Sequence, residues 1–146
     1  MFILKTAFII ILFLNISNSY ASNIKNSAVV FMYHKFGIDK YPTTSVTIDQ
    51  FDSHIVEFTK EKYSVKSLEY IVDTIINDGN LPENTIGISI DDADKSFYEV
   101  GWPIFKKNNM PVTLFVNTST IHKNNKNYLN WDQIRQLEKE GVAIGA

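Results

Sequence analysis

Residues 86–94, IGISIDDAD, join a short apolar run to a cluster of acids. The isoleucines at every second position predict a buried strand. Three carboxylates follow at its end: Asp91, Asp92 and Asp94. Adjacent carboxylates in a half-buried site repel one another, so keeping them ionised normally requires a cation or a basic partner. The stretch therefore predicts a strand whose carboxyl end carries a candidate functional site.

Strand patterns alternate with helix patterns on both sides of this stretch. Continuous apolar runs predict strands at 28–33, 86–90, 112–116 and from 142 onward. Helical spacing with capping residues predicts helices at about 48–61, from 68 to a left-handed cap at Gly79, at 96–107 and from 131 to Gly141. Such alternation favours parallel strands with crossover helices in one α/β layer or barrel.

Composition limits the classes of function. Fourteen Lys and Arg residues stand against sixteen Asp and Glu residues, and the net charge of −2 comes with no basic stripe along the sequence. Nucleic acid is therefore not an expected partner. The chain has no cysteine, which excludes a disulfide framework.

The first 21 residues have the anatomy of a signal peptide. Lys5 precedes an apolar run over residues 7–14, and a polar stretch then ends at Ala21. The apolar run is well below the roughly 20 residues that a membrane-spanning helix needs. We expect cleavage after Ala21, no stable membrane span afterwards, and export to the periplasm or the extracellular space. The mature domain would be residues 22–146.

The acids after the strand allow two chemical interpretations, besides the one in which an acid merely caps the next helix. Asp92 and Asp94 form the Asp-x-Asp arrangement of magnesium-dependent haloacid dehalogenase-like phosphatases, in which the first acid is the nucleophile. Alternatively, the adjacent pair Asp91 and Asp92 divides the work between a metal ligand and a proton acceptor for the bound water. Spacing alone leaves these alternatives open.

Four segments in order favour the adjacent pair: MYHKFG at 32–37, SIDDA at 89–93, WPIFKKNNMPVTLFV at 102–116 and LNWDQIRQLEKEGVAIGA at 129–146. Together they resemble the NodB-type polysaccharide deacetylase family. The resemblance implies the amino-terminal part of a distorted (β/α) barrel with parallel strands. It also implies a divalent metal, often zinc, and hydrolysis of acetamido groups on an N-acetylated polysaccharide or a peptidoglycan sugar.

The resemblance assigns roles to the two adjacent acids. Asp91 matches the family's catalytic base, and Asp92 matches its metal-binding aspartate. The family's two metal-binding histidines follow the segment matched by GVAIGA, so the resemblance implies a domain truncated before them and inactive as this fragment. A non-catalytic, sugar-binding remnant is the alternative. Ala93 stands where the family commonly has glycine, so a turn that needs a positive φ would be strained there.

Four further side chains are candidates for lining the site. His34 follows the first strand and is expected at the same rim as Asp92. Asp94 is expected to cap the next helix or to touch substrate. Tyr98 and Trp102 lie one helical turn apart, which is typical of core or of a groove wall, and they alternatively stack on a sugar. Trp131 is expected in the core.

Overall fold

The structure is a computed structural model that describes residues 26–122 and 125–145, so the predicted signal peptide lies outside the described residues. The strands are β1 (Ala28–Tyr33), β2 (Lys35–Phe36), β3 (Ser45–Val46), β4 (Ser64–Val65), β5 (Thr85–Asp91), β6 (Thr113–Phe115) and β7 (Ala143–Gly145). The helices are α1 (Ile48–Phe58), α2 (Leu68–Ile76), a π-helical segment (Phe97–Gly101), α3 (Trp102–Lys107), α4 (Thr118–His122) and α5 (Trp131–Lys139).

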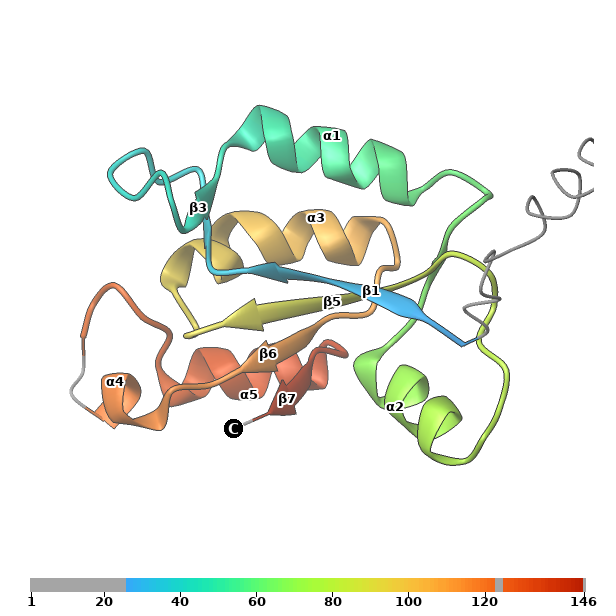
Figure 1. The fold of residues 1–146 in the computed structure, drawn as a ribbon. Helices are drawn as coiled ribbons and strands as arrows, with labels where there is room; N and C mark the ends of the chain where they lie inside the picture. The colour runs from blue at the N-terminus through green and yellow to red at the C-terminus, as the bar shows by residue number, and fades with distance from the viewer. Residues whose placement is uncertain (1–25, 123–124, 146) are drawn as a thin grey trace, which may run out of the picture.

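Strand β5 is the centre of a parallel sheet (Figure 1). The order β1-β5-β6-β7 describes the main path, and β4 also pairs with the beginning of β5. Every ladder of this sheet is parallel. Parallel neighbours require crossover connections, which the helices between the strands supply. The predicted α/β fold with parallel strands is therefore confirmed.

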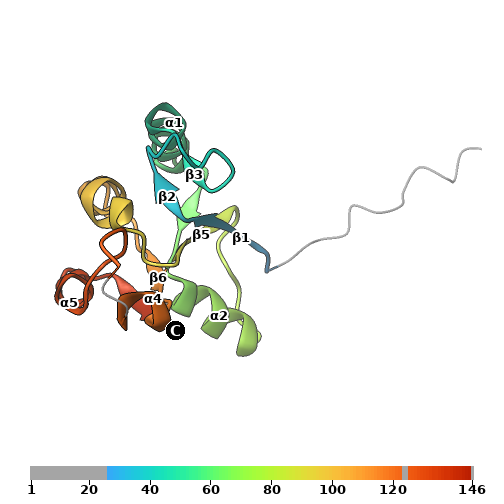
Figure 2. The same cartoon turned by 90° about the vertical axis from the view of Figure 1, so that its left-hand side faces the viewer.

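Helices α1, α3 and α5 cover one face of the sheet, whereas α2 lies on the other (Figure 2). The first face encloses an aromatic core. The ring of Phe51 from α1 lies 4.8 Å from that of Phe36 and 5.0 Å from that of Phe105 in α3. Phe51, Ile55 and Phe58 recur at helical spacing and are all buried, as the sequence pattern predicts. Thr47 and Gln50 form the predicted capping box at the start of α1.

On the other face, α2 approaches the backbone of β5 at Gly87. A Cβ built on Gly87 would lie 2.5 Å from Leu68 Cδ2 and 3.0 Å from Ile71 Cδ1. These distances are shorter than van der Waals contact, so the close packing of α2 requires a residue without a side chain here.

We expect Gly87→Ala to lower the free energy of unfolding by about 1–3 kcal/mol, because the new methyl group overpacks the contact with Leu68. Urea denaturation measures this. Combining the change with Leu68→Ala removes the clashing methyl group, so the double variant should lose less than the sum of the two single losses. Additive losses would show that Leu68 is not the obstacle.

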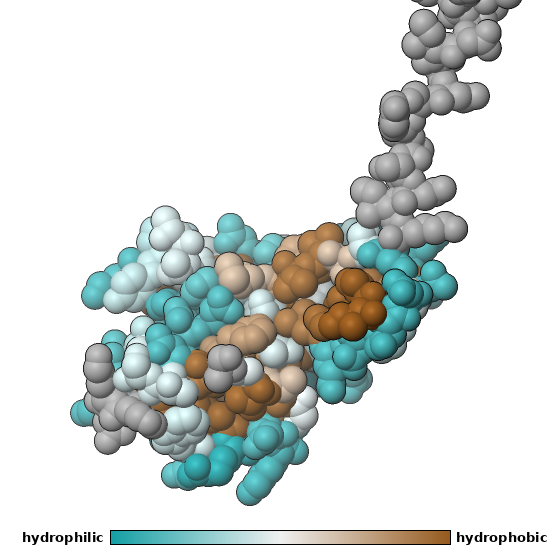
Figure 3. Space-filling view, turned by 60° about the horizontal axis from the view of Figure 1, so that its bottom comes forward, coloured by the Kyte–Doolittle hydropathy of each residue, from teal (hydrophilic) through white to brown (hydrophobic). Residues whose placement is uncertain are grey.

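The apolar stripe predicted for α2 is only partly used. Ile71 is buried, but Val72, Ile75 and Ile76 are exposed. Exposed Val30 and Met32 of β1 belong to the same side of the molecule, where Figure 3 shows apolar residues gathered. This side of the sheet is therefore open compared with the face that α1, α3 and α5 cover.

Three local predictions need correction or refinement. Helix α2 ends with Asp78 in the left-handed region at φ 51°, so the predicted cap at Gly79 is wrong by one residue. Trp131 is 37% exposed, and the prediction that it belongs to the core is also wrong. The predicted helix at 96–107 exists but contains the π-helical segment, in which the N–H of Trp102 bonds to Phe97 O. Pro103, which has no N–H, follows immediately.

Gly141 has a φ of 102° and ends α5 as predicted. Among residues 26–122 and 125–145, no helix has the length and apolar character needed to cross a membrane.

Candidate active site

Asp91 is the last residue of β5 and lies at the carboxyl edge of the sheet, beside Phe115 of β6. Successive residues of a strand point to opposite faces, and Ile90 is fully buried on the side that α1 and α3 cover. Asp91 therefore belongs to the open face, with Ser89, and it is half-buried there. Ligands bind at this edge in parallel α/β folds.

The turn after β5 has an unusual backbone. Asp92 has a φ of 70° and Ala93 a φ of 58°, so two successive residues with side chains occupy the left-handed region. Such residues cost roughly 1–2 kcal/mol each, and they persist only where the surroundings hold them. Ala93 is fully buried, and its carbonyl accepts a hydrogen bond of 3.0 Å from the N–H of Leu129. The strain predicted for a turn with a positive φ at Ala93 therefore applies here.

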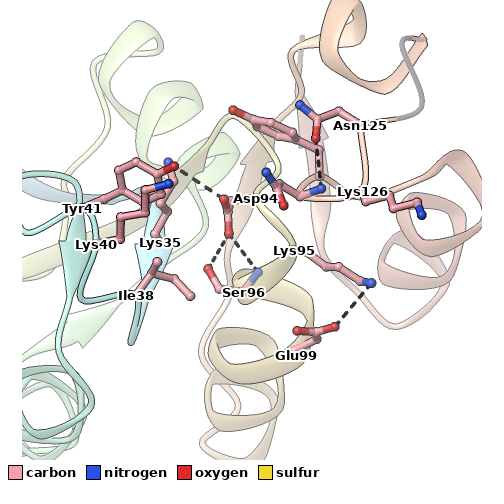
Figure 4. A pocket seen from close by; sticks show the side chains of 12 residues that line it. Lys35, Ile38, Lys40, Tyr41, Asp94, Lys95, Ser96, Glu99, Asn125 and Lys126 are labelled. Atoms are coloured by element: carbon pink, nitrogen blue, oxygen red, sulfur yellow. Dashed lines mark hydrogen bonds and ion pairs between the residues drawn. The ribbon is translucent and has the colours of Figure 1, made fainter.

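The side chain of Asp94 is buried and makes structural contacts. Its Oδ1 accepts hydrogen bonds from the N–H of Ser96 at 3.0 Å and from the hydroxyl of Ser96 at 2.7 Å. Ser96 Oγ in turn accepts from the N–H of Phe36 at 3.0 Å, and Lys35 Nζ lies 3.9 Å from Asp94 Oδ2 (Figure 4). The predicted capping role of Asp94 is confirmed.

The carboxylates of Asp91 and Asp92 differ from that of Asp94. Within the described part of the chain, neither makes a hydrogen bond or an ion pair to another side chain or to the backbone. Both are half-buried. The arrangement therefore leaves the adjacent pair available for a ligand. It disfavours the phosphatase interpretation, since Asp94 would have to share a magnesium ion with Asp92 while it caps a helix and faces Lys35.

A complete metal site is not formed by the described residues. Over residues 26–122 and 125–145, no group of three or more His, Cys, Asp or Glu side chains is arranged to hold a metal ion. A catalytic zinc usually has three protein ligands and one open position. The described donors alone do not fit such a metal, and Asp92 can supply at most one of its ligands.

His34 is half-buried and lines a cavity of about 380 Å³ together with His54 and Gln50. This is not the cavity that Asp94 lines. His54 packs between α1 and β1, where its Nδ1 lies 2.9 Å from Tyr33 Oη. Burial raises the pKa of the Tyr33 phenol above its ordinary value of 10. The role of His34 as a site-lining residue stays a prediction.

Tyr98 and Trp102 face α5. The hydroxyl of Tyr98 donates to Gln136 Oε1 at 2.8 Å, and the buried indole of Trp102 donates to Glu140 Oε2 at 2.6 Å. These bonds tie the segment after β5 to α5 on the covered face of the sheet. The contacts favour the packing interpretation of this pair over sugar stacking.

The Trp102 indole, the Gln136 amide and Lys106 together lower the pKa of Glu140 from its ordinary value of 4.5 to about 2. Because the folded pKa is the lower one, the stabilisation is present above pH 4.5 and is lost as pH falls toward 2. We expect Trp102 fluorescence to change as the pH approaches 2, where Glu140 of the folded chain becomes protonated, in a Trp131→Phe background. Adding Glu140→Gln should remove the transition, and a transition that persists would assign it to another group.

A cavity of about 630 Å³ lies beside the turn, and sequence reasoning missed it. Four lysines from three segments line it: Lys35 and Lys40, Lys95, and Lys126. They are up to 91 positions apart, so they form no basic stripe in the sequence. The sequence contains one indication of this cavity. Each of the four lysines lies in or next to a segment that follows a predicted strand, and such segments start at the carboxyl edge of a parallel sheet.

Comparison with known proteins shows what this chain is similar to. Residues 78–146 match a family model described as polysaccharide deacetylase. A poly-β-1,6-N-acetyl-D-glucosamine N-deacetylase of Staphylococcus aureus (strain MSSA476) is 29% identical over 125 residues, which cover 86% of this chain and 41% of that protein. The corresponding protein of Staphylococcus epidermidis is 26% identical over 129 residues, 79% of this chain and 44% of that protein. The chain thus spans less than half the length of these curated relatives.

Solved structures give the same result for the fold. A de-N-acetylase from Aggregatibacter actinomycetemcomitans superposes with a TM-score of 0.70 at 24% identity, over 80% of this chain and 53% of that one. IcaB from Ammonifex degensii superposes with a TM-score of 0.72 at 20% identity, over 82% of this chain and 52% of that one. The predicted resemblance and the predicted partial fold are confirmed.

Proposed function

From the match of residues 78–146 to the polysaccharide deacetylase family, we propose that this chain forms part of a domain that removes acetyl groups from an N-acetylated polysaccharide. One observation carries the proposal most directly. Asp91 ends β5 at the carboxyl edge and Asp92 follows it, and neither carboxylate is bonded within the described part of the chain. The resemblance matches these two acids to the catalytic base and the metal-binding aspartate. Asp94, the third acid, is engaged elsewhere.

The proposed chemistry is hydrolysis of an acetamido group. Asp91 accepts a proton from the water that attacks the carbonyl carbon, and the released products are acetate and a free amine. Asp92 contributes one ligand to a divalent metal, commonly zinc in the family. Such a metal supplies polarisation of the carbonyl oxygen and a lower pKa for the attacking water. Its other ligands must come from outside the described residues, because these contain no group of three donors.

The proposed substrate is a β-linked N-acetylglucosamine polymer, with peptidoglycan sugar as the second candidate. The Staphylococcus relatives are named for poly-β-1,6-N-acetyl-D-glucosamine. A polymer of this kind outside the cytoplasm agrees with the signal peptide proposed at residues 1–21 and hence with a periplasmic or extracellular location.

A chimaera tests the proposal. Residues 22–146 would replace the matched segment of the Staphylococcus aureus relative, which supplies the rest of the domain. We expect a folded chimaera to bind a divalent metal and to release acetate from β-1,6-linked N-acetylglucosamine oligomers, with activity lost on chelation and restored by metal. A folded chimaera that binds the metal but releases no acetate would contradict the proposal.

The same preparation separates the alternatives. Oligosaccharide binding without metal uptake would support the sugar-binding remnant. Magnesium-dependent release of phosphate from p-nitrophenyl phosphate, lost in Asp92→Asn, would support the phosphatase.

A further inference from the structure

The 630 Å³ cavity next to the turn after β5 has no role in the proposed reaction (Figure 4). It lies between the segment after β1, the first turn of the helix after β5, and residues 125–128. Its volume is that of a site for a small ligand or for one or two sugar units. Neither Asp91 nor Asp92 is among the described residues that line it.

The charge of the cavity is positive although the chain as a whole carries −2. Two of its four lysines face acids, since Lys35 Nζ lies 3.9 Å from Asp94 and Lys95 Nζ lies 3.6 Å from Glu99. Among the described side chains, no acid pairs with the other two lysines, Lys40 and Lys126. Both are exposed. Figure 4 shows Lys40 and Lys126 on opposite sides of the hollow, so each contributes positive charge at its rim. This excess of positive charge favours an anionic group.

The remaining lining suits a sugar ring better than a bare ion. The ring of Tyr41 has Lys35 Nζ at 5.3 Å and Lys40 Nζ at 5.4 Å from its centroid. Tyr128, Asn125 and Asn127 complete the wall. The two lysines lie over the Tyr41 ring, so the groups suited to a sugar are the side-chain amides, which bond to hydroxyl groups.

The cavity is tied to the turn that carries the two free aspartates. A backbone bridge joins Asp94 to Tyr128, and the N–H of Lys95 bonds to Asn127 O at 2.9 Å. Asp94 itself lines the cavity and is only two residues from Asp92. A polymer passing the turn would therefore present a neighbouring unit to the lysines.

We propose that this cavity binds a sugar unit carrying a carboxylate or another acidic substituent, located on the same polymer as the acetylated unit. The statement that the acidic unit belongs to the same polymer as the acetylated unit rests on the proposed function. The binding of an acidic sugar by the cavity does not. Among N-acetylated polysaccharides, the proposal favours those that also carry acidic units.

Two oligosaccharides of equal length provide the test. A hyaluronan tetrasaccharide alternates N-acetylglucosamine with glucuronate, whereas chitotetraose contains N-acetylglucosamine alone. In calorimetric titration of the chain at about 50 mM salt, we expect the hyaluronan tetrasaccharide to bind at least 10-fold more tightly. The preference should fall several-fold at about 500 mM salt, because exposed charges are then screened.

Paired variants locate the effect. Lys40→Gln with Lys126→Gln should bring the preference down to 2-fold or less. Lys107→Gln with Lys139→Gln changes the net charge equally at exposed lysines outside the cavity and should leave the preference unchanged. An equal loss in both pairs would show a nonspecific charge effect and would overturn the proposal.

Two other outcomes would also overturn it. Equal affinity for the two tetrasaccharides would show that the acid is not recognised. Binding of free glucuronate and of inorganic phosphate as tight as that of the hyaluronan tetrasaccharide would show a simple anion site without sugar recognition. Failure of acetate release in the chimaera, together with an intact preference for the acidic tetrasaccharide, would overturn the proposed reaction alone.

Discussion

Replacing Asp91 by asparagine in the chimaera should lower the rate of acetate release by about 10²–10⁴-fold, the range expected when a general base is removed. The amide keeps the size of the side chain but cannot accept the proton of the attacking water. Asp91 ends β5 on the open face and makes no described contact that the substitution would break. The folding of the chain should therefore be unchanged, as thermal denaturation would verify.

Metal content distinguishes the two acids. Asp91→Asn should retain the metal measured in the wild-type chimaera, whereas Asp92→Asn should lose both metal and activity. Asp94→Asn is the matched control for the third acid. It should lower stability through the bonds to Ser96 and leave the metal content as in wild type. Retention of full activity by Asp91→Asn would remove the catalytic role from this residue.

The second large effect concerns the core. Phe51→Ala should lower the free energy of unfolding by about 3–5 kcal/mol, because it removes a fully buried ring from between Phe36 and Phe105 and leaves a cavity. Urea denaturation of the chain, followed by circular dichroism, measures the loss.

Val56→Ala on the same helix is the control for the core substitution. Val56 is 64% exposed, so its truncation should cost within about 0.5 kcal/mol. Similar losses in both variants would mean that the aromatic cluster does not carry the stability of this face.

The features that the sequence predicted well are local or periodic. The capping box of Thr47 and Gln50 is a contact over three residues, and the alternating isoleucines of β5 report burial directly. The resemblance predicted the partial barrel fold, since its four segments fall on β1, β5, β6 and the α5–β7 region. For Ala93 the resemblance predicted only that a turn with a positive φ would be strained, and the structure shows that such a turn exists.

The features that it missed depend on contacts between distant residues. The left-handed residue after α2 is Asp78, although Gly79 is the better left-handed residue by type. The N–H of Gly79 bonds to Thr74 O and so sets the last turn. The indole of Trp102 donates a hydrogen bond to Glu140, which is 38 positions away in the sequence. The lysines of the cavity likewise meet only after the strands have been placed side by side, and no sequence window contains them all.

The backbone bridge between the turn and residues 125–129 has a consequence for natural variation. The carbonyl of Ala93 accepts a hydrogen bond from the N–H of Leu129, and the N–H of Lys95 donates to Asn127 O. The orientation of the neighbouring aspartates therefore depends on a loop more than 30 positions downstream. Substitutions in that loop could misdirect the acids without changing either of them. Sequence changes in this loop among homologues would then be limited by the need to keep the two aspartates in place. Compensating substitutions are expected at positions 93–95.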